Sequence, residues 1–360
     1  MRKDINLVKH SYNDDCIFLL KDLTNDIKEI TIKEKEELIR SGINYSEMIS
    51  KENKPSEDVK NIFLNMLKRD KKMIAYYVAK ISEMVYRNKG NDLVIVSLAR
   101  AGTPYGILIR KYLSFKYNIN VPHYSISIIR GKGVDVNALK YIVSKHKEGK
   151  IQFIDGWTGK GSITKELDKS INKFNEENNT NIDNSLAVIS DPAKLCSICG
   201  TREDFGIATC CLNSTVSGLV SRTIHNEKYI GKDDFHGAKT LYYLKDDDYS
   251  QYFIDEIFEI FKDIKICEED LKIEIEDKEY SIDITNKIRQ LYDVSNINNI
   301  KLSIGESARV LLRRDPRIVL VKDKNDRNIE HIIKLAEEKG VEVIEYKFSD
   351  YNCISIINEK

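Results

Sequence analysis

Alternating apolar and polar stretches predict buried strands separated by helices in the first part of the chain. Apolar side chains recur at helical spacing between Leu67 and Tyr86, which predicts an amphipathic helix. The apolar run at 93–97 predicts a buried strand, and Thr103 and Pro104 suit the first turn of a following helix. Further strands are expected at 124–129, 151–154 and 186–189, and a polar helix at Ser162. This order predicts an α/β fold, a mostly parallel sheet with helices on both faces and ligands beyond the strands' carboxyl ends.

The C-terminal part shows a second, smaller unit. Residues 262–279 hold eight acids against four lysines, which marks a boundary. Beyond it the pattern predicts a helix at 304–313, a strand at 318–321, a helix at 328–339 and a strand at 341–346. We therefore expect a first domain at 1–265, a boundary segment at 266–284, and a small α/β sandwich at 285–360.

Composition narrows the class of protein. The 360 residues are 41% hydrophobic, and 57 Lys and Arg balance 57 Asp and Glu, so the whole chain carries no charge-based signal for a polyanion. The start lacks an apolar signal core, and no run is long enough to span a bilayer. Seven cysteines form an odd, irregular set typical of reduced thiols. These features predict a cytoplasmic globular protein with no membrane partner.

A Gly-rich segment after the strand at 151–154 carries the clearest chemical signal. The segment begins with an acid, Asp155, and ends at Ser162, where a helix starts. The positive end of that helix faces the loop between the two residues. Such a loop suits a sugar phosphate, with Asp155 accepting hydrogen bonds from ribose hydroxyls and backbone amides holding the phosphate. An acid at a tight turn between strand and helix is the structural alternative. The candidate binding residues are Asp155, Thr158, Gly159, Lys160, Gly161 and Ser162.

This segment resembles the 5-phosphoribosyl-1-pyrophosphate (PRPP) loop of type I phosphoribosyltransferases, although Gly156 stands where that family has a second acid. The turn at 97–103 resembles the family's pyrophosphate loop, and the segment 128–135 suits a mobile lid. The resemblance implies a phosphoribosyltransferase that uses PRPP with Mg²⁺ and an unidentified acceptor. It assigns pyrophosphate binding to Arg100, Ala101 and Gly102, and catalysis to Asp155, Arg130 and Lys132. For the two lid cations, a solvated surface loop is the alternative.

A narrower resemblance covers nearly the whole chain. The stretches 45–48, 97–104, 123–131, 155–161 and 212–223 are similar to a bacterial family of tellurite-resistance clusters, described both as phosphoribosyltransferase-like and, under the name StiP, as a cysteine protease. A protease needs a thiolate beside a histidine. Candidates are Cys16, Cys196, Cys199, Cys210 and Cys211, with His123, His225 and His236. None of the cysteines stands between a strand and a helix as a nucleophile, so phosphoribosyl transfer is favoured over the protease and over a non-catalytic PRPP- or nucleotide-sensing RNA regulator.

Polar residues after the strand at 186–189 are candidates for the acceptor side. They are Asp191, Arg202, Asp204, Asn213, Ser214 and Arg222. Ser214 as a helix cap and Arg222 as a surface ion-pair partner are the alternatives. Cys196 and Cys199 with Cys210 and Cys211 raise the possibility of zinc, but adjacent cysteines suit a two-plus-two knuckle poorly. We therefore predict no protein metal site.

Residues 285–360 resemble the Pelota-type RNA-binding domain. Residues 301–327 hold eight basic side chains against four acids, and a basic patch suits phosphate contacts. In the turn 303–309, Ser307 and Ala308 replace the Asn-Glu pair of that family's base readers. RNA contact is predicted at Lys301, Arg309, Arg313 and Arg314, with a solvated helix face as the alternative.

Overall fold

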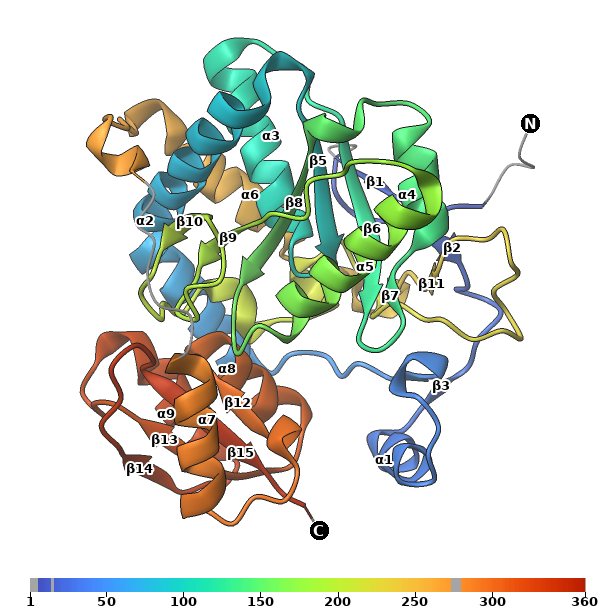
Figure 1. The fold of residues 1–360 in the computed structure, drawn as a ribbon. Helices are drawn as coiled ribbons and strands as arrows, with labels where there is room; N and C mark the ends of the chain where they lie inside the picture. Colours follow the sequence, from blue (N-terminus) through green and yellow to red (C-terminus); the bar gives the residue numbers. More distant parts are fainter. Residues whose placement is uncertain (1–5, 14–15, 273–279, 360) are drawn as a thin grey trace.

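A seven-stranded sheet forms the centre of the larger unit in a computed structural model, which describes residues 6–13, 16–272 and 280–359 (Figure 1). Its order is β1-β6-β5-β8-β9-β10, with every neighbouring pair parallel, and β7 adds an antiparallel hairpin to β6. The strands are β1 (Ile17–Phe18), β5 (Val94–Ala99), β6 (His123–Ile129), β7 (Gly133–Val134), β8 (Ile151–Trp157), β9 (Leu186–Ser190) and β10 (Ile198–Thr201). The expected mostly parallel sheet is confirmed.

Helices cover both faces of this sheet, as predicted (Figure 1). The helices α2 (Glu57–Lys89), α3 (Thr103–Tyr117) and α6 (Ser250–Phe258) contribute to one hydrophobic cluster, and α4 (Val136–Val143) and α5 (Ser162–Asn178) to another. Helix α2 begins ten residues before the predicted segment, since the Ser56 side chain caps it by accepting from the Val59 amide. The short elements outside the central sheet are β2 (Lys21–Asp22) paired with β11 (Gly237–Ala238), β3 (Glu29–Ile30) paired with β4 (Ile49–Ser50), and α1 (Ile32–Arg40).

Strand β8 continues three residues beyond its predicted end. Asp155 and Trp157 pair in register with Val188 and Ser190 of β9, so the residue predicted to begin a turn is extended. The turn occupies 158–161 instead, where Gly161 adopts φ of 81°, a left-handed conformation that favours glycine. Helix α5 then begins at Ser162, where the sequence predicts it.

The C-terminal unit is a four-stranded sheet in the order β12-β15-β13-β14, with helices on both faces. Its elements are α7 (Tyr280–Leu291), β12 (Ile300–Leu302), α8 (Ile304–Arg313), β13 (Pro316–Val321), α9 (Glu330–Glu338), β14 (Val343–Glu345) and β15 (Cys353–Ile357). Along β13, Ile318 and Leu320 pack beneath α7, whereas Val319 and Val321 pack beneath α8 and α9. The sequence predicts α8, β13, α9 and β14 but not α7, β12 or β15. Of the predicted boundary segment, residues 273–279 lie outside the described part of the chain.

The two units share one hydrophobic cluster rather than meeting through a polar surface. Apolar residues of α8 and α9, among them Ile304 and Leu335, belong to the same cluster as those of α2, α3 and the short 3₁₀ helix η4 (Ala208–Cys211). Buried Asp204 adds polar contacts by accepting hydrogen bonds from the amides of Ile304 and Asn352. The smaller unit is therefore docked against the carboxyl-end edge of the larger sheet (Figure 1).

Candidate active site

The loops singled out in the sequence do meet at one edge of the sheet. A Cβ added at Gly102 would lie 2.3 Å from the carbonyl oxygen of Ile154, so the 100–102 turn touches the end of β8. Arg130, at the end of β6, lines the same small cavity as Asp155 and Lys160. Parallel topology thus brings these three residues together, as the sequence predicts.

The C-terminal unit covers this edge. The Lys160 ammonium donates to the Ile297 carbonyl at 2.5 Å, and the Tyr351 hydroxyl donates to the Gly159 carbonyl at 2.9 Å. The cavity left at the loop measures about 60 Å³, whereas pockets for small organic ligands run from about 300 to 1,000 Å³. The described structure leaves no room here for a pentose carrying three phosphates.

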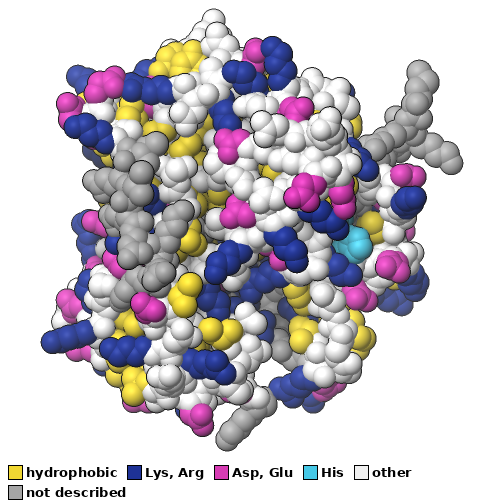
Figure 2. Space-filling model, viewed as in Figure 1, with side chains coloured by type: hydrophobic (Ala, Val, Ile, Leu, Met, Phe, Trp, Pro, Cys, Tyr) yellow, Lys and Arg dark blue, Asp and Glu magenta, His cyan; other side chains and the backbone are white. Residues whose placement is uncertain are grey.

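Several cationic side chains lie at the seam between the two units, that is, around the small cavity lined by Arg130, Lys160, Lys301 and Arg309. Figure 2 shows Lys and Arg side chains along the line where the upper and lower parts of the molecule meet. Burial, together with Lys301 and Arg130, lowers the pKa of Lys160 to about 8. Burial also raises the pKa of Asp155 to about 6. The predicted lid cation Lys132 lies apart from them, exposed on the turn between β6 and β7.

Arg100, predicted to face a pyrophosphate, is paired inside the protein. Its guanidinium lies 2.5 Å from a carboxylate oxygen of Glu52 and donates to the Val220 carbonyl at 2.7 Å. The same Glu52 carboxylate accepts from the Ser214 hydroxyl at 2.7 Å. Burial acts to raise the pKa of Glu52, but Arg100, together with Arg313 and the hydrogen bond from Ser214, outweighs burial and holds that pKa below its usual range. Arg100 and Ser214 therefore fix the segment before α2.

Of the other predicted acceptor-side residues, Asp191 and Arg222 are also held by internal contacts, whereas the buried side-chain oxygen of Asn213 has no hydrogen-bond partner among the described residues. Asp191 accepts from the Thr158 hydroxyl at 2.6 Å and pairs with Arg202. Arg222 donates to the carbonyls of Tyr45 and Met48, and its guanidinium lies 4.9 Å from the centre of the Tyr45 ring. These contacts join loops of the larger unit.

Two of the predicted RNA-binding residues face the larger unit rather than solvent. The Arg309 guanidinium lies 4.2 Å from the centre of the Trp157 ring and 3.0 Å from Glu306. Arg313 donates to the Leu212 carbonyl at 3.4 Å. Lys301 lines the small cavity at the seam. These side chains are therefore only partly accessible to RNA in the described conformation.

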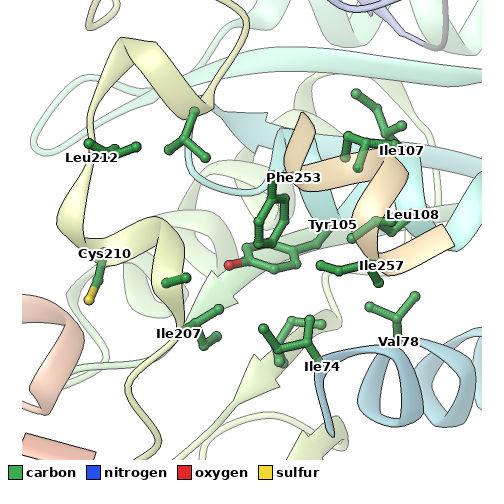
Figure 3. Close-up of a cluster of buried hydrophobic side chains, with 14 of the residues drawn as sticks. Ile74, Val78, Tyr105, Ile107, Leu108, Ile207, Cys210, Leu212, Phe253 and Ile257 are labelled. Carbon is green, nitrogen blue, oxygen red and sulfur yellow. The ribbon is translucent and has the colours of Figure 1, made fainter. Parts of the chain in front are cut away.

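A thiol–imidazole pair lies at the same junction, deeper in the protein. Cys210 and Cys211 come from η4, and His331 comes from α9; all three are buried. The Cys210 sulfur lies 3.8 Å from Nε2 of His331 and 3.9 Å from the Cys211 sulfur. The Tyr105 hydroxyl contacts that of Thr209 at 2.5 Å and so fixes η4. Figure 3 shows the Cys210 sulfur directed away from the apolar cluster around Tyr105 and Phe253.

The surroundings of Cys210 favour its thiolate. The hydrogen bond from Cys211 lowers the pKa of Cys210, burial opposes this effect, and the contact with His331 lowers the pKa further. The pKa of Cys211 is raised by its hydrogen bond to Cys210 and by burial, so Cys211 remains a thiol donor. A thiolate beside an imidazole is the arrangement that nucleophilic cysteine chemistry needs. Among the described residues, Nδ1 of His331 has no hydrogen-bond partner, so the pair is a dyad rather than a triad.

The other cysteine–histidine contact has a packing role. Cys16 lies 3.8 Å from Nε2 of His123, which also lies 2.7 Å from the Ser97 hydroxyl. A Cβ added at Gly106 would lie 2.4 Å from that nitrogen, so helix α3 seals it and leaves no space for an acyl group. Cys196 and Cys199 belong to a different hydrophobic cluster from Cys210 and Cys211, so these four do not meet as a zinc knuckle.

His331 was not among the histidines considered in the sequence. It stands 121 residues beyond Cys210, in the smaller unit, and no local motif joins the two. The available signal was a polar residue beside the apolar face formed by Ile329, Ile332 and Leu335. A buried histidine at such a position is more often a packed core residue. Only the docking of α9 on η4 places His331 beside the Cys210 thiol.

These features define a mixed α/β protein in which a cysteine of one unit meets a histidine of the other. Comparison with known sequences gives the family: residues 10–258 match the tellurite-like stress resistance cysteine protease StiP family, to which the chain belongs. The cysteine protease StiP of Acinetobacter baylyi is 32% identical over 357 residues, covering 95% of this chain and 92% of that protein. Residues 279–359 match the PELOTA RNA binding domain. No solved structure matches.

The prediction of a phosphoribosyltransferase is wrong. The family and the relative are both named as cysteine proteases, and the covered loop at 158–161 gives a physical reason why the PRPP assignment fails. The Mg²⁺ expectation was tied to that substrate and loses its basis with it. The resemblance to the StiP and Pelota families is confirmed. In the described residues, every helix is too short or too polar to cross a bilayer.

Proposed function

We propose that this protein is a cysteine protease in which the Cys210 thiolate is the nucleophile and His331 is the general acid and base. The observation that carries the proposal is the 3.8 Å contact between the Cys210 sulfur and Nε2 of His331, in surroundings that lower the thiol pKa. The name of the relative, which spans 95% of the chain, supports the same reaction.

In this reaction the Cys210 sulfur attacks the carbonyl carbon of a peptide bond. Nε2 of His331 gives its proton to the departing amine as the carbon–nitrogen bond breaks, leaving a thioester on Cys210. His331 then takes a proton from water, whose oxygen attacks the thioester carbon and releases the acid. Release of the acid restores the Cys210 thiolate and leaves the proton on His331, as at the start, so water is the only other reactant.

Two cavities reach the dyad or its neighbours. One of about 330 Å³ reaches Cys211 and Leu212, and one of about 160 Å³ reaches His331 and Met66. The Cys210 sulfur itself is fully buried, so a peptide reaches it only when α9 moves away from η4. The described conformation is therefore the closed state of the protease, and separation of the two units opens it.

The test is hydrolysis of a fluorescein-labelled unfolded casein by the purified full chain. Cys210→Ala and His331→Ala are each expected to lower kcat/KM at least about 1,000-fold, because members of a nucleophile–base pair act as a unit. Cys199→Ala is the matched control, since Cys199 is a buried cysteine outside any disulfide in the other hydrophobic cluster, and it should retain the rate. Full activity in Cys210→Ala would overturn the assignment of the nucleophile.

We also propose that the C-terminal unit binds RNA through Lys301, Arg309, Arg313 and Arg314. The match of residues 279–359 to an RNA-binding domain supports this second role. The measurement is fluorescence anisotropy of a labelled mixed-sequence RNA with the full chain at two salt concentrations. Arg314→Glu should weaken binding, with Lys173→Glu, on the far helix α5, as control. Equal affinity in the two variants would refute the proposed surface.

A further inference from the structure

A set of soft ligand atoms surrounds the Cys210 sulfur. The sulfur atoms of Cys210 and Cys211 and a ring nitrogen of His331 all lie within 4.8 Å of one another. The Met66 thioether lies beside them, 3.5 Å from the Cys211 sulfur. All four side chains are at most 4% exposed.

The spacing of these atoms fits a trigonal metal centre. With metal–sulfur bonds of about 2.3 Å and a metal–nitrogen bond of about 2.0 Å, three ligands in a plane stand about 4.0 Å apart for two sulfurs and about 3.7 Å for sulfur and nitrogen. The observed distances are 3.9 Å between the two sulfurs and 3.8 Å between the Cys210 sulfur and Nε2 of His331. The third distance, between the Cys211 sulfur and a ring nitrogen of His331, is at most 4.8 Å, so an ion among the three atoms needs these two side chains to approach by no more than about 1 Å.

Ligand chemistry selects the kind of ion. Thiolate and thioether sulfur favour soft metals, copper(I) above all, whereas hard cations need carboxylate or carbonyl oxygens. Charge also suits a monovalent ion, since two thiolates and one copper(I) leave a single negative charge. Arg309 and Arg69 lie near enough to interact electrostatically with Cys210 and Cys211, respectively.

We propose that Cys210, Cys211 and His331 form a binding site for one copper(I) ion, with the Met66 sulfur beside it. Binding replaces the thiol proton of Cys211 by the metal and releases that proton to solvent. The pocket lined by Met66 and His331 gives the ion a path from the surface. Copper(I) uses the same sulfur and nitrogen as the dyad, so, where the proposed protease activity holds, the ion switches it off.

The first test measures copper(I) itself. The full chain is titrated anaerobically with copper(I) in competition with bathocuproine disulfonate, and one equivalent should bind. Cys211→Ser and His331→Ala should each weaken binding at least about 100-fold, because even outer-shell changes cost about 10–100-fold. Cys199→Ser is the matched control and should bind as the unaltered protein does. Near-ultraviolet circular dichroism checks that each variant is folded, and X-ray absorption should show sulfur and nitrogen neighbours.

Binding that is equally strong in Cys211→Ser, or stronger retention of zinc(II) than of copper(I), overturns the site. Casein hydrolysis with and without one equivalent of copper(I) separates this inference from the protease. A protein that binds copper(I) through the three residues but cleaves nothing refutes only the protease. A protein that cleaves casein at the same rate with one equivalent of copper(I) present refutes the copper site.

Discussion

Arg309 of α8 lies over the ring of Trp157 at the end of β8, with its guanidinium carbon 4.2 Å from the ring centre. This cation–π contact joins the two units beside the seam and involves the only tryptophan of the chain. Intrinsic fluorescence of the protein therefore reports on the same junction that closes the dyad.

Gly305→Ala should loosen that junction. A Cβ at this position would lie 2.5 Å from the Trp157 indole, too close for the present packing. We expect a loss of about 1–3 kcal/mol in the free energy of unfolding by urea, together with a changed Trp157 emission. Gly149→Ala, where an added Cβ meets nothing within 4 Å, is the control. Equal free energies of unfolding for the two variants would show that the junction accommodates the added methyl group without cost, which would contradict this prediction.

The same change should expose the nucleophile. In the unaltered protein we expect iodoacetamide to modify exposed Cys267 well before buried Cys210. In Gly305→Ala the rate at Cys210 should rise, and casein hydrolysis with it, while Cys267 reacts as before. Peptide mass spectrometry over a time course measures both sites. An unchanged rate at Cys210 despite a shifted Trp157 emission would contradict a dyad opened by domain separation.

The stability of the junction should depend on pH through Asp204. Burial raises its pKa to about 7, so the folded protein holds a proton that the unfolded chain releases near pH 4. Rising pH therefore lowers stability between about pH 4 and 7 by way of this group, and no further above that range. Asp204→Asn should flatten this part of the profile in urea unfolding from pH 4.5 to 8, whereas Asp263→Asn, at an exposed site, should not.

Glu52→Gln should destabilise the protein strongly. The change removes the partner of Arg100 at a site where both side chains are at most 15% exposed, and an uncompensated buried charge costs about 3–5 kcal/mol. Urea unfolding measures the loss, and a double-mutant cycle with Arg100→Met separates the pair from its surroundings. Glu177→Gln breaks an exposed pair with Lys173 and should cost less than about 1 kcal/mol. Similar losses in both single variants would contradict the structural role of Glu52.

Local patterns predicted the helices and strands whose signals are strongest. Helix α8 has the predicted bounds, because its apolar positions follow a clear helical period after Ser303, whose side chain caps the first turn. The first turns of α2 were missed although Val59, Ile62, Phe63 and Met66 already follow a helical period and are buried; the helix begins where Ser56 caps it. Strand β15 escaped because a short apolar run near the end of a chain does not by itself distinguish strand from helix.

Other features depend on contacts between segments that are distant in the sequence, and local sequence patterns did not predict them. Asp155 and Gly156 have the composition of a turn, yet both belong to β8 because pairing with β9 extends the strand. The covering of the 158–161 loop depends on Tyr351 and Ile297, more than 100 residues away in sequence. The Cys210–His331 contact arises in the same way, from docking of two units, so its two halves carry no shared spacing that a sequence could reveal.

Because one hydrophobic cluster runs through both units, we expect neither unit to be stable as a separate fragment. A chain cut between them would leave apolar faces of α8, α9 and η4 open to water, a surface prone to aggregation. Truncated forms of the chain would therefore precipitate or reassociate, since each unit depends on the other to cover its apolar face.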